Sequence, residues 1–473
     1  MKRIFVLLAA CLTLLVPGLW SQNVGIGTPS PAGKLHIKGS ADVSQLIIDA
    51  HTTQSNTAPL LKLRNSMGTD LLWMHSDTAL NTFIGIYAGR VNNAIGGGVF
   101  NTYTGSHAGF SSTTGNSNSG FGANSLFLNA TGNFNSAHGL NSLFSNASGS
   151  WNTGIGANAL FANLSGNNNV ALGNTALFSN TTGSWNTAIG TDAMNQNTTG
   201  IYNMANGFKA LFSNTIGGFN TANGAFALHD NTEGSLNTAI GGQALLNNTT
   251  GTNNTALGTN ALSDNESGYN NTALGAEAGA WPWHLYNITA VGYDAVVDSN
   301  NKVRVGNASV TSIGGQVSWT NLSDARIKKN IQENIPGLSF IMALRPVTYQ
   351  YNIDKQNTLL GRNNSVDWEG KYAIEKISFS GFIAQEVETA ARQIGYDFSG
   401  IDKNGILYGL RYAEFVVPLV KAVQELNQQL IKQNESLVNQ LKTQDIMMLE
   451  MKTRLDQFEQ QQKMILEFIA NKK

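Results

Sequence analysis

Ser323 and Lys328 are the residues of this chain whose types and spacing could do chemistry, and they lie in the stretch LSDARIKKNI at 322–331. A serine hydroxyl is a weak nucleophile until a base takes its proton, and a neutral lysine amine can be that base. Burial favours the neutral amine because it disfavours the charged form. In a turn leading into a short helix or loop, side chains five residues apart can come within hydrogen-bond reach. Spacing alone does not separate such a pair from an ordinary solvated turn.

The stretch lies at a sharp change in composition. Charged residues make up 12% of the 473-residue chain, against roughly 25% in ordinary globular proteins. Only six Asp, Glu, Lys or Arg residues fall between Ser117 and Tyr269, whereas charge, proline and helical patterns appear from Ser323 onward. The net charge of -1 gives no field that would attract nucleic acid, and His138 and His229 stand alone. We therefore expect no nucleic-acid partner, no metal site and no cofactor.

A repeat of seventeen residues fills the middle of the chain. From Ser117 to Tyr269 the sequence divides into nine such units, with the consensus x-N-T-A-[IL]-G-x-x-A-L-x-x-N-x-x-G-x. One glycine register runs from Gly105 to Gly292 without a slip, and a second runs from Gly115 to Gly268. Repeats of this kind indicate a solenoid, in which each unit buries its apolar face against its neighbours.

Short strands are the secondary structure that suits this repeat. Glycine costs roughly 1 kcal/mol against alanine inside a helix, and asparagine and threonine prefer caps and turns. We predict two strands per unit, NTAIG and the segment around ALF, joined by glycine turns, with Ile or Leu, Ala and Leu pointing inward. The Asn-x-Ser/Thr triplets are interpreted as turn and ladder residues rather than glycan sites. The expected fold class is mostly β, with a parallel β-roll or β-helix shaft over residues 81–300.

Other segments flank this shaft. Residues 22–80 predict a β-rich cap or attachment module with strands in KLHIKG, SQLIIDA and APLLKLRN, and residues 301–322 predict a neck with three short β runs. From about residue 412 the tail is helical, with 3,4-spaced apolar residues over 416–437 and again over 441–469. This pattern predicts a coiled coil with one stutter. A single amphipathic helix packed on its own domain is the alternative.

The first residues have the order of a secretory signal. Lys2 and Arg3 precede an apolar run that is too short for a comfortable membrane span, and small and polar residues follow near Ser21. We expect residues 1–21 to be a signal peptide and the mature chain to have no transmembrane segment. The sole cysteine, Cys11, lies inside the run, so the mature chain would have no disulfide. A lipoprotein cleavage box at LAAC is the alternative.

Four motifs follow one another in the C-terminal part: SDARIKKNI, LRPVTYQY, GFIAQEVE and YAEFVVPLVKAVQELNQQL. Together they resemble the intramolecular chaperone domain of phage endosialidases and tail spikes, a self-cleaving serine-lysine peptidase family that also occurs in myelin regulatory factor. The resemblance implies an α+β chaperone domain over residues 323–473, with the coiled coil at its end. The shaft resembles the heads of trimeric autotransporter adhesins, whose usual period differs, and the shafts of phage tail fibres. This second resemblance implies a homotrimer.

Carried over by position, the resemblance makes Ser323 the nucleophile and Lys328 its base, with the cut between Leu322 and Ser323. Lys329 has no counterpart in the dyad and is interpreted as a surface charge. GFIAQEVE is interpreted as a segment that packs and orients the site. Positioning roles fall to the neighbours that also match the start of the motif, Asp324 and Arg326.

The expected cleavage site lies at the end of the shaft, which suits a domain that helps the shaft to assemble and is then cut off. Near-identical coils can pair out of register at little energetic cost, so a C-terminal clamp that holds three chains together would set their register and raise their effective concentration. Removing the clamp would then leave the fibre kinetically trapped. We expect an exported bacterial protein, secreted or at the cell surface. It would be a homotrimeric fibre or adhesin whose C-terminal domain folds the shaft and then cuts itself off, an enzyme acting once on its own chain.

Two alternatives stay open. One is a structural adhesin whose clamp remains attached and never cuts. The other is a glycan- or ice-binding solenoid whose Asn and Thr rows form a flat face, although aromatic residues such as Trp151 and Trp185 start only some units. Beside copies of the chain itself, the partner to consider is a cell-surface glycan or protein receptor. The sequence does not separate a cell-surface fibre from a phage-derived one.

Overall fold

The structure is a computed structural model that describes residues 24–26, 35–37, 44, 46–49, 56–361, 368 and 370–471. The predicted signal peptide, residues 1–21, lies outside these residues. Two compact units make up the chain, Met1–Ser165 and Gly166–Lys473, and both contain coils of the repeat.

Short strands precede the coils in the first unit. The strands predicted in KLHIKG and APLLKLRN are β2 and β3, whereas the prediction for SQLIIDA is wrong. Its described residues, 44 and 46–49, are exposed and form no strand, and an apolar run becomes a strand only where another is placed to pair with it. The pairs are β1 (Val24–Ile26) with β2 (Leu35–Ile37), β3 (Leu61–Arg64) with β4 (Asp70–His75), and β4 with β5 (Thr82–Ile84).

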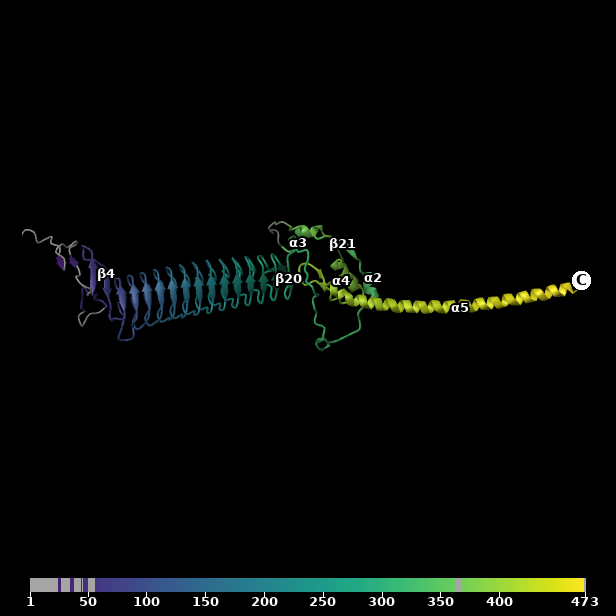
Figure 1. Cartoon of the computed structure of the whole chain (residues 1–473), viewed down its shortest axis with the longest axis horizontal. Coiled ribbons are helices and arrows are strands. Elements are labelled where there is room, and N and C mark those ends of the chain that lie inside the picture. The colour runs from purple at the N-terminus through teal and green to yellow at the C-terminus, as the bar shows by residue number, and fades with distance from the viewer. Residues whose placement is uncertain are drawn as a thin grey trace, which may run out of the picture. The chain divides into compact units, whose positions relative to one another are not determined.

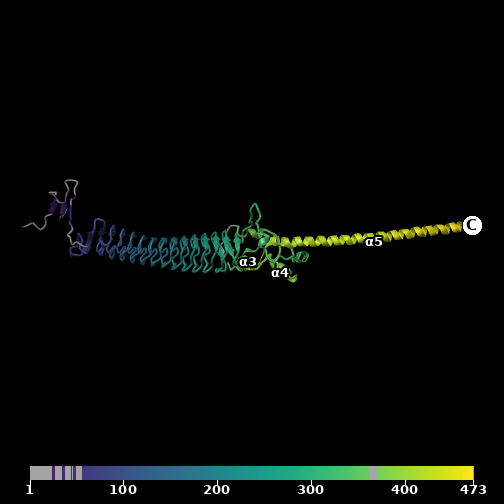
Figure 2. The same cartoon turned by 90° about the horizontal axis from the view of Figure 1, so that it is seen from below.

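Each coil contributes one short strand to a parallel ladder, so the predicted parallel solenoid is confirmed. Figures 1 and 2 show these strands stacked one above another within each unit. Most partners are one repeat apart, as Thr187 and Met204 are. In the first unit the strands are β5, β6 (Thr102–Thr104), β7 (Ser119–Phe121), β8 (Ser136–His138) and β9 (Thr153–Ile155). In the second they are β10 (Val170–Leu172), β11 (Thr187–Ile189), β12 (Met204–Asn206), β13 (Thr221–Asn223), β14 (Thr238–Ile240), β15 (Thr255–Leu257), β16 (Thr272–Leu274), β18 (Thr289–Val291) and β20 (Val303–Val305).

The prediction of two strands in every coil is wrong. The segment around ALF forms turns, because its leucine position and the residue two before it have positive φ, as Met194 (φ 49) and Asp192 (φ 58) do. Such left-handed residues turn the chain sharply and close each coil tightly around its core. Among the described coils, a second strand pair forms near the end of the shaft, between β17 (Gly279–Ala280) and β19 (Val296–Val297).

Small and medium apolar side chains fill the interior of the coils. Ala188, Ala193 and Met194 of one coil are fully buried, as predicted for the alanine and leucine positions. Where a strand ends in Ile or Leu, that side chain points outward, which contradicts the prediction: Ile240 is 39% and Leu274 46% exposed. Side chains alternate along a strand, so an inward alanine at the centre turns its neighbours outward.

Two ladders of buried asparagines run through the stacked coils. In the first, Asn220 accepts a bond from the backbone N–H of Asn237 (3.0 Å) and donates to the carbonyl of Gly234 (2.8 Å). In the second, each side chain donates to the one a coil earlier, as Asn197 does to Asn180 (2.8 Å). These bonds satisfy the buried polar groups. Many asparagines of the second ladder are the first residue of an Asn-x-Ser/Thr triplet. The prediction that these triplets contain ladder residues is therefore confirmed.

Backbone contact between coils fixes the first glycine register. Gly190 and Gly207 have φ of 125 and 147, values that residues with a side chain rarely adopt. A Cβ on Gly207 would lie 2.5 Å from the carbonyl oxygen of Gly224 in the next coil. Glycine is therefore required where successive coils touch.

Aromatic side chains stack from coil to coil on the outside of the second unit. Trp185, Tyr202 and Phe219 are each about half exposed, and their ring centroids are 5.1 and 4.9 Å apart with nearly parallel planes. A ligand that stacks on an aromatic face thus finds only the end rings of such a row free.

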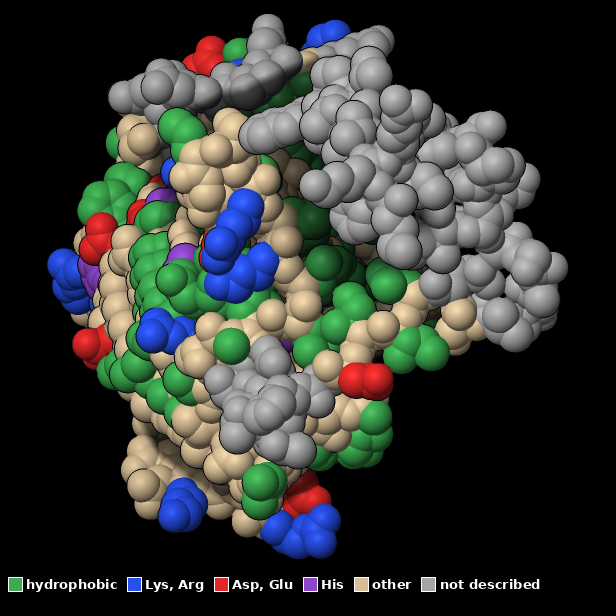
Figure 3. All heavy atoms as spheres, turned by 90° about the vertical axis from the view of Figure 1, so that its left-hand side faces the viewer, with side chains coloured by type: hydrophobic (Ala, Val, Ile, Leu, Met, Phe, Trp, Pro, Cys, Tyr) green, Lys and Arg blue, Asp and Glu red, His purple; other side chains and the backbone are tan. Residues whose placement is uncertain are grey.

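The face drawn in Figure 3 is mostly uncharged, with scattered Lys, Arg, Asp and Glu.

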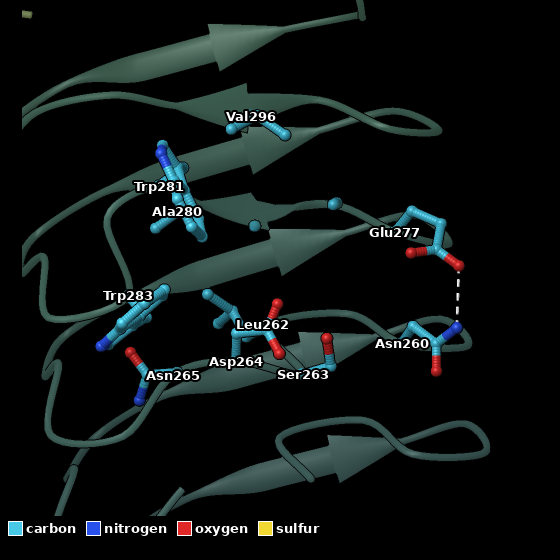
Figure 4. Close-up of a pocket in the computed structure, with 12 residues that line it drawn as sticks. Asn260, Leu262, Ser263, Asp264, Asn265, Glu277, Ala280, Trp281, Trp283 and Val296 are labelled. Carbon is cyan, nitrogen blue, oxygen red and sulfur yellow. Dashed lines mark hydrogen bonds between the residues drawn. The ribbon is translucent and has the colours of Figure 1, made fainter. Parts of the chain in front are cut away.

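The repeat changes near the end of the shaft. Pro282 and Leu285 stand where earlier coils have the second-ladder asparagine and the second-register glycine, and Leu285 is buried in the core. Trp281 and Trp283 meet edge to face with ring centroids 4.9 Å apart. They border a cavity of about 100 Å³ whose polar side includes Glu277 (Figure 4). The second asparagine ladder therefore stops before the neck.

The neck contains one strand, where the prediction had three. β20 continues the ladder of the shaft, but residues 307–322 form no strand. Every residue from 310 to 334 is exposed. In a single chain these apolar runs have no strand to pair with, and an unpaired strand is unstable in water.

The part of the chain after residue 323 is a small α+β domain, as the resemblance implied. Several of its short elements pack around one core, beside the start of the longer helix at its end. They are η1 (Ala325–Ile327), α2 (Leu338–Ala343), β21 (Val347–Tyr349), α3 (Ile353–Leu359), η2 (Ala373–Lys376), β22 (Phe379–Gly381), α4 (Ala384–Gln393), β23 (Ile401–Asp402), β24 (Gly409–Leu410), η3 (Tyr412–Phe415) and α5 (Val416–Ala470). The core consists of Phe340, Val387, Ala390, Ala391, Phe398 and Phe415.

Helix α5 has 55 residues and packs only through its beginning. Pro418 and Ala422 are its buried residues, and Glu425 accepts a bond from the backbone N–H of Leu338 at the start of α2 (2.7 Å). In both views α5 extends past α4, and in Figure 1 also past α2 (Figures 1 and 2), and every described residue from 426 onward is exposed. The predicted long terminal helix is confirmed, with its apolar seam uncovered in one chain.

Candidate functional site

One turn of 3-10 helix brings the two predicted dyad residues together. The turn, η1, lies between them, and Lys328 closes it through a backbone N–H bond to the carbonyl of Ala325 (3.2 Å). The Lys328 Nζ atom lies 2.7 Å from the Ser323 Oγ atom and donates to it. The same pair of atoms can carry the bond in the opposite sense, with the hydroxyl donating to a neutral amine. This is the contact that a serine needs with its base.

Asp324 and Arg326 hold the same turn from its other side. The Asp324 carboxylate caps η1 by accepting from the backbone N–H of Arg326 (2.8 Å), and it also accepts from the Arg326 guanidinium (Nε 3.0 Å, Nη2 2.6 Å). The guanidinium and that N–H lower the pKa of Asp324, and the carboxylate raises the pKa of Arg326. Both side chains are solvent-exposed. Their contacts are local and shape the turn that separates Ser323 from Lys328.

The dyad lies on an open segment. Ser323, Lys328 and the neighbouring Lys329 are all exposed, and Leu322 before the expected cut is 89% exposed. A lysine accepts a proton only in its neutral form, which withdrawal from water favours. The segment is also unusually apolar for an exposed loop. Its uncovered side chains include Ile313, Val317, Trp319, Ile327 and Ile331.

The remaining family-like motifs pack against the core of the domain, and Val387 and Phe415 are their buried core residues. The strand of LRPVTYQY, β21, pairs with β22, whose last residue, Gly381, is the first residue of GFIAQEVE, and Val347 lies opposite Gly381. In α4, Val387 is buried, and Arg345 binds Glu386 (Nε to Oε2, 3.0 Å). Tyr412 accepts from the backbone N–H of Phe382 through its hydroxyl (3.0 Å). GFIAQEVE therefore packs, as predicted, while its orienting effect on the dyad stays a prediction.

The comparison with known families agrees with this layout. Residues 323–396 match the family model described as the chaperone of endosialidase, a peptidase family. The match begins at Ser323, the first residue of the candidate dyad. The match supports a C-terminal chaperone domain, which follows the β-solenoid shaft in the same chain. No curated protein matches the chain.

Other candidate chemistry is sparse in the described part of the chain. No group of three or more His, Cys, Asp or Glu side chains there is placed to hold a metal ion. His138 stacks on Phe121 and His229 on Phe212. None of the described helices is both long and apolar enough to cross a bilayer.

Sequence reasoning missed one charged cluster. Lys302 of the neck binds Asp298 (3.0 Å) and also Asp402 of the C-terminal domain (3.2 Å). The four-residue spacing of Asp298 and Lys302 was a local signal. Asp402 is a hundred residues further on, and only the folded structure brings it there.

Proposed function

We propose that this protein is an exported homotrimeric fibre whose C-terminal domain assembles the shaft and then cuts itself off between Leu322 and Ser323. The observation that carries the proposal is the 2.7 Å contact between Ser323 Oγ and Lys328 Nζ at the first residue of the family match. The enzyme acts once, on its own chain. No cofactor takes part in the proposed reaction.

The proposed reaction balances with one water molecule. Lys328, in its neutral form, takes the hydroxyl proton while Ser323 Oγ attacks the carbonyl carbon of Leu322. The Leu322–Ser323 peptide bond breaks, an ester to Oγ forms, and Lys328 returns the proton to the leaving Ser323 nitrogen. Water then hydrolyses the ester, which yields a carboxylate on Leu322, a free amine on Ser323 and the original hydroxyl.

Assembly would shelter the dyad from water, which a single chain does not do. The dyad is open to solvent in one chain, and the apolar side chains around it are uncovered. Packing of neighbouring copies over this segment would exclude water and favour a neutral Lys328. The exposed apolar seam of α5, with Leu426 at 55% and Leu430 at 53%, offers the contact that brings copies together. Cleavage would then report correct assembly.

Register is the reason for a helper domain. Successive coils make the same hydrogen bonds, so a chain shifted by one repeat satisfies most of its partners. Three chains joined at their C-terminal ends start from a common point, and folding can proceed from the neck toward the other end. Once the covalent link to the helper is cut, the assembled state is hard to reverse.

A denaturing gel with intact-mass measurement tests the proposal. Assembled wild-type protein should give a fragment of residues 323–473 and a fragment ending at Leu322. Ser323→Ala should abolish the cut, and Lys328→Ala should slow it by on the order of 10²-fold or more, because a general base is lost. The matched control is Lys329→Ala, which removes the adjacent exposed amine and should cut normally.

The rival function is a structural adhesin that keeps its clamp. Assembled wild-type protein that stays whole for days would favour this rival and overturn the cleavage proposal. Cutting that persists in Ser323→Ala would equally remove Ser323 as the nucleophile. The same mass measurement reports the mature N-terminus, and a start near residue 22 is expected for an exported chain.

A further inference from the structure

Contacts between the shaft end and the C-terminal domain do not pass through the cleavage segment. The last coils and the neck make direct contacts with the domain at Gly361, Trp368, Lys371, Asp402 and Gly405. The covalent connection between them, residues 310–334, is exposed along its whole length. Cutting at Leu322 would therefore remove one peptide bond and leave the contacts in place.

We propose that the shaft end, centred on Asp298 and Lys302, is a docking surface that keeps the severed C-terminal domain bound as a non-covalent cap. The inference rests on the proposed self-cleavage for its biological meaning. Its physical content, a stable contact without a covalent link, does not depend on how the chain is cut.

A partly buried charge cluster forms the centre of this surface. The Asp298 side chain is 2% exposed and Lys302 is 19% exposed, and Lys302 bridges Asp298 (3.0 Å) to Asp402 of the domain (3.2 Å). Gly405 lies directly against the Asp298 carboxylate, with no room for a Cβ. Departure of the domain would leave Lys302 with one carboxylate partner instead of two and expose charges that are now sheltered.

The Asp402 carboxylate is suited to this bridge. Burial alone would raise its pKa, but the backbone N–H of Asn404 and the ammonium of Lys302 outweigh burial and hold the pKa below the usual range. Arg411 lies 4.0 Å from the same carboxylate. Asp402 therefore faces the shaft in its charged form at neutral pH.

Contacts of other kinds surround the cluster. Ser309 of the neck donates its hydroxyl to the carbonyl of Lys371 in the domain (2.6 Å). Tyr293 of the shaft meets Trp368 edge to face, with ring centroids 5.5 Å apart. On the coil shown in Figure 4, Trp281 lies so close to Gly361 that a Cβ there would be 3.2 Å from the indole nitrogen.

A cap at this position has a physical purpose. β20 is the last strand of the ladder in the second unit and pairs on one side with β18. An open edge strand invites pairing with other chains, and solenoids need a distinct unit at each end. The domain lies over this edge. A cavity of about 630 Å³ between them is lined by Val303 and Val305 of β20 and by Tyr351, Phe379 and Tyr408 of the domain.

The test separates docking from self-cleavage. A Ser323→Ala chain would carry a recognition sequence for a site-specific protease in place of part of residues 311–321, which are exposed. After the added protease has cut, size-exclusion chromatography at low salt should show both fragments eluting together. High salt should weaken the complex only modestly, because partly buried charge pairs are screened much less than exposed ones. Fragments that separate at once in low salt would overturn the proposal.

Variants assign the contact to the charge cluster. Lys302→Gln and Asp402→Asn should each speed dissociation of the cut domain by about tenfold or more, because each leaves a sheltered charge with fewer partners. Lys329→Gln, in the exposed segment, is the control and should dissociate like the parent. Equal dissociation in all variants would overturn the role of Lys302 and Asp402. Failure of the intact dyad to cut would remove the proposed function and leave this result standing.

Discussion

At the scale of single residues, the shaft depends on glycines that let one backbone rest on the next. Gly207 and Gly242 are a matched pair for testing this. Gly207 has a φ of 147 and would press a Cβ against the Gly224 carbonyl oxygen, whereas the nearest atom to a Cβ on Gly242, the carbonyl oxygen of Ala225, is 3.9 Å away. The same substitution to alanine can therefore be compared at a position with a positive φ and a close backbone neighbour and at a position with open surroundings.

Gly207→Ala should lower the free energy of unfolding by about 2 kcal/mol or more, through strained φ and separation of two coils. Gly242→Ala should change it by less than about 1 kcal/mol. Urea unfolding followed by circular dichroism measures both. Equal losses in the two variants would show that coil contact does not set the first glycine register.

The candidate site was partly visible in the sequence. Ser323 and Lys328 could be named from residue type, spacing and resemblance, because a short turn suffices to join residues five apart. The capping of that turn by Asp324 is also local, so it could be anticipated from position. The link from Lys302 to Asp402 could not, because it depends on where the chain returns after a hundred residues.

At the scale of elements, α5 has an apolar seam that is exposed in the single chain. Its seam residues Leu426 and Leu430 are exposed in the single chain and lie on the coiled-coil face, whereas Gln428 lies on the opposite face. Leu426→Asp with Leu430→Asp should abolish trimers and, with them, self-cleavage. Gln428→Asp is the control and should do neither.

Sedimentation velocity and the denaturing gel together measure this prediction. A doubly substituted chain that is monomeric and still cuts itself would show that the dyad is complete without neighbours. A doubly substituted chain that remains trimeric would move the trimer contact from α5 to the shaft or to the apolar segment near Trp319.

The secondary structure of the coils was predicted in kind and missed in detail. The fixed glycines and the Asn and Thr residues disfavoured a helix and so indicated short strands, and the strand with central Ala188 bears this out. The same pattern does not reveal that Met194 and Asp192 adopt positive φ, because such conformations are rare for residues other than glycine. Asparagine was expected on turns and in ladders, but the hydrophobic pattern gave no sign that it would fill the core beside alanine.

At the scale of the whole molecule, one repeat is the unit that can be removed. Deletion of Trp185–Ile201, a complete repeat, joins Ser184 to Tyr202 and keeps both glycine registers. Because each coil contacts only its neighbours, stability should fall slightly and self-cleavage should persist. Deletion of Trp185–Gly200, one residue shorter, shifts every later position and should cause unfolding at a much lower temperature. Thermal unfolding and the gel measure both, and equal stability of the two deletions would contradict the nearest-neighbour description.

Asparagine and glycine recur at the same positions in successive repeats, and this affects how the number of repeats can change during evolution. Slippage or unequal crossing-over between near-identical repeats adds or removes whole units, and each product stays in frame with its core intact. The length of the shaft can then vary in single-coil steps. The helper at the other end would go on assembling shafts of every length.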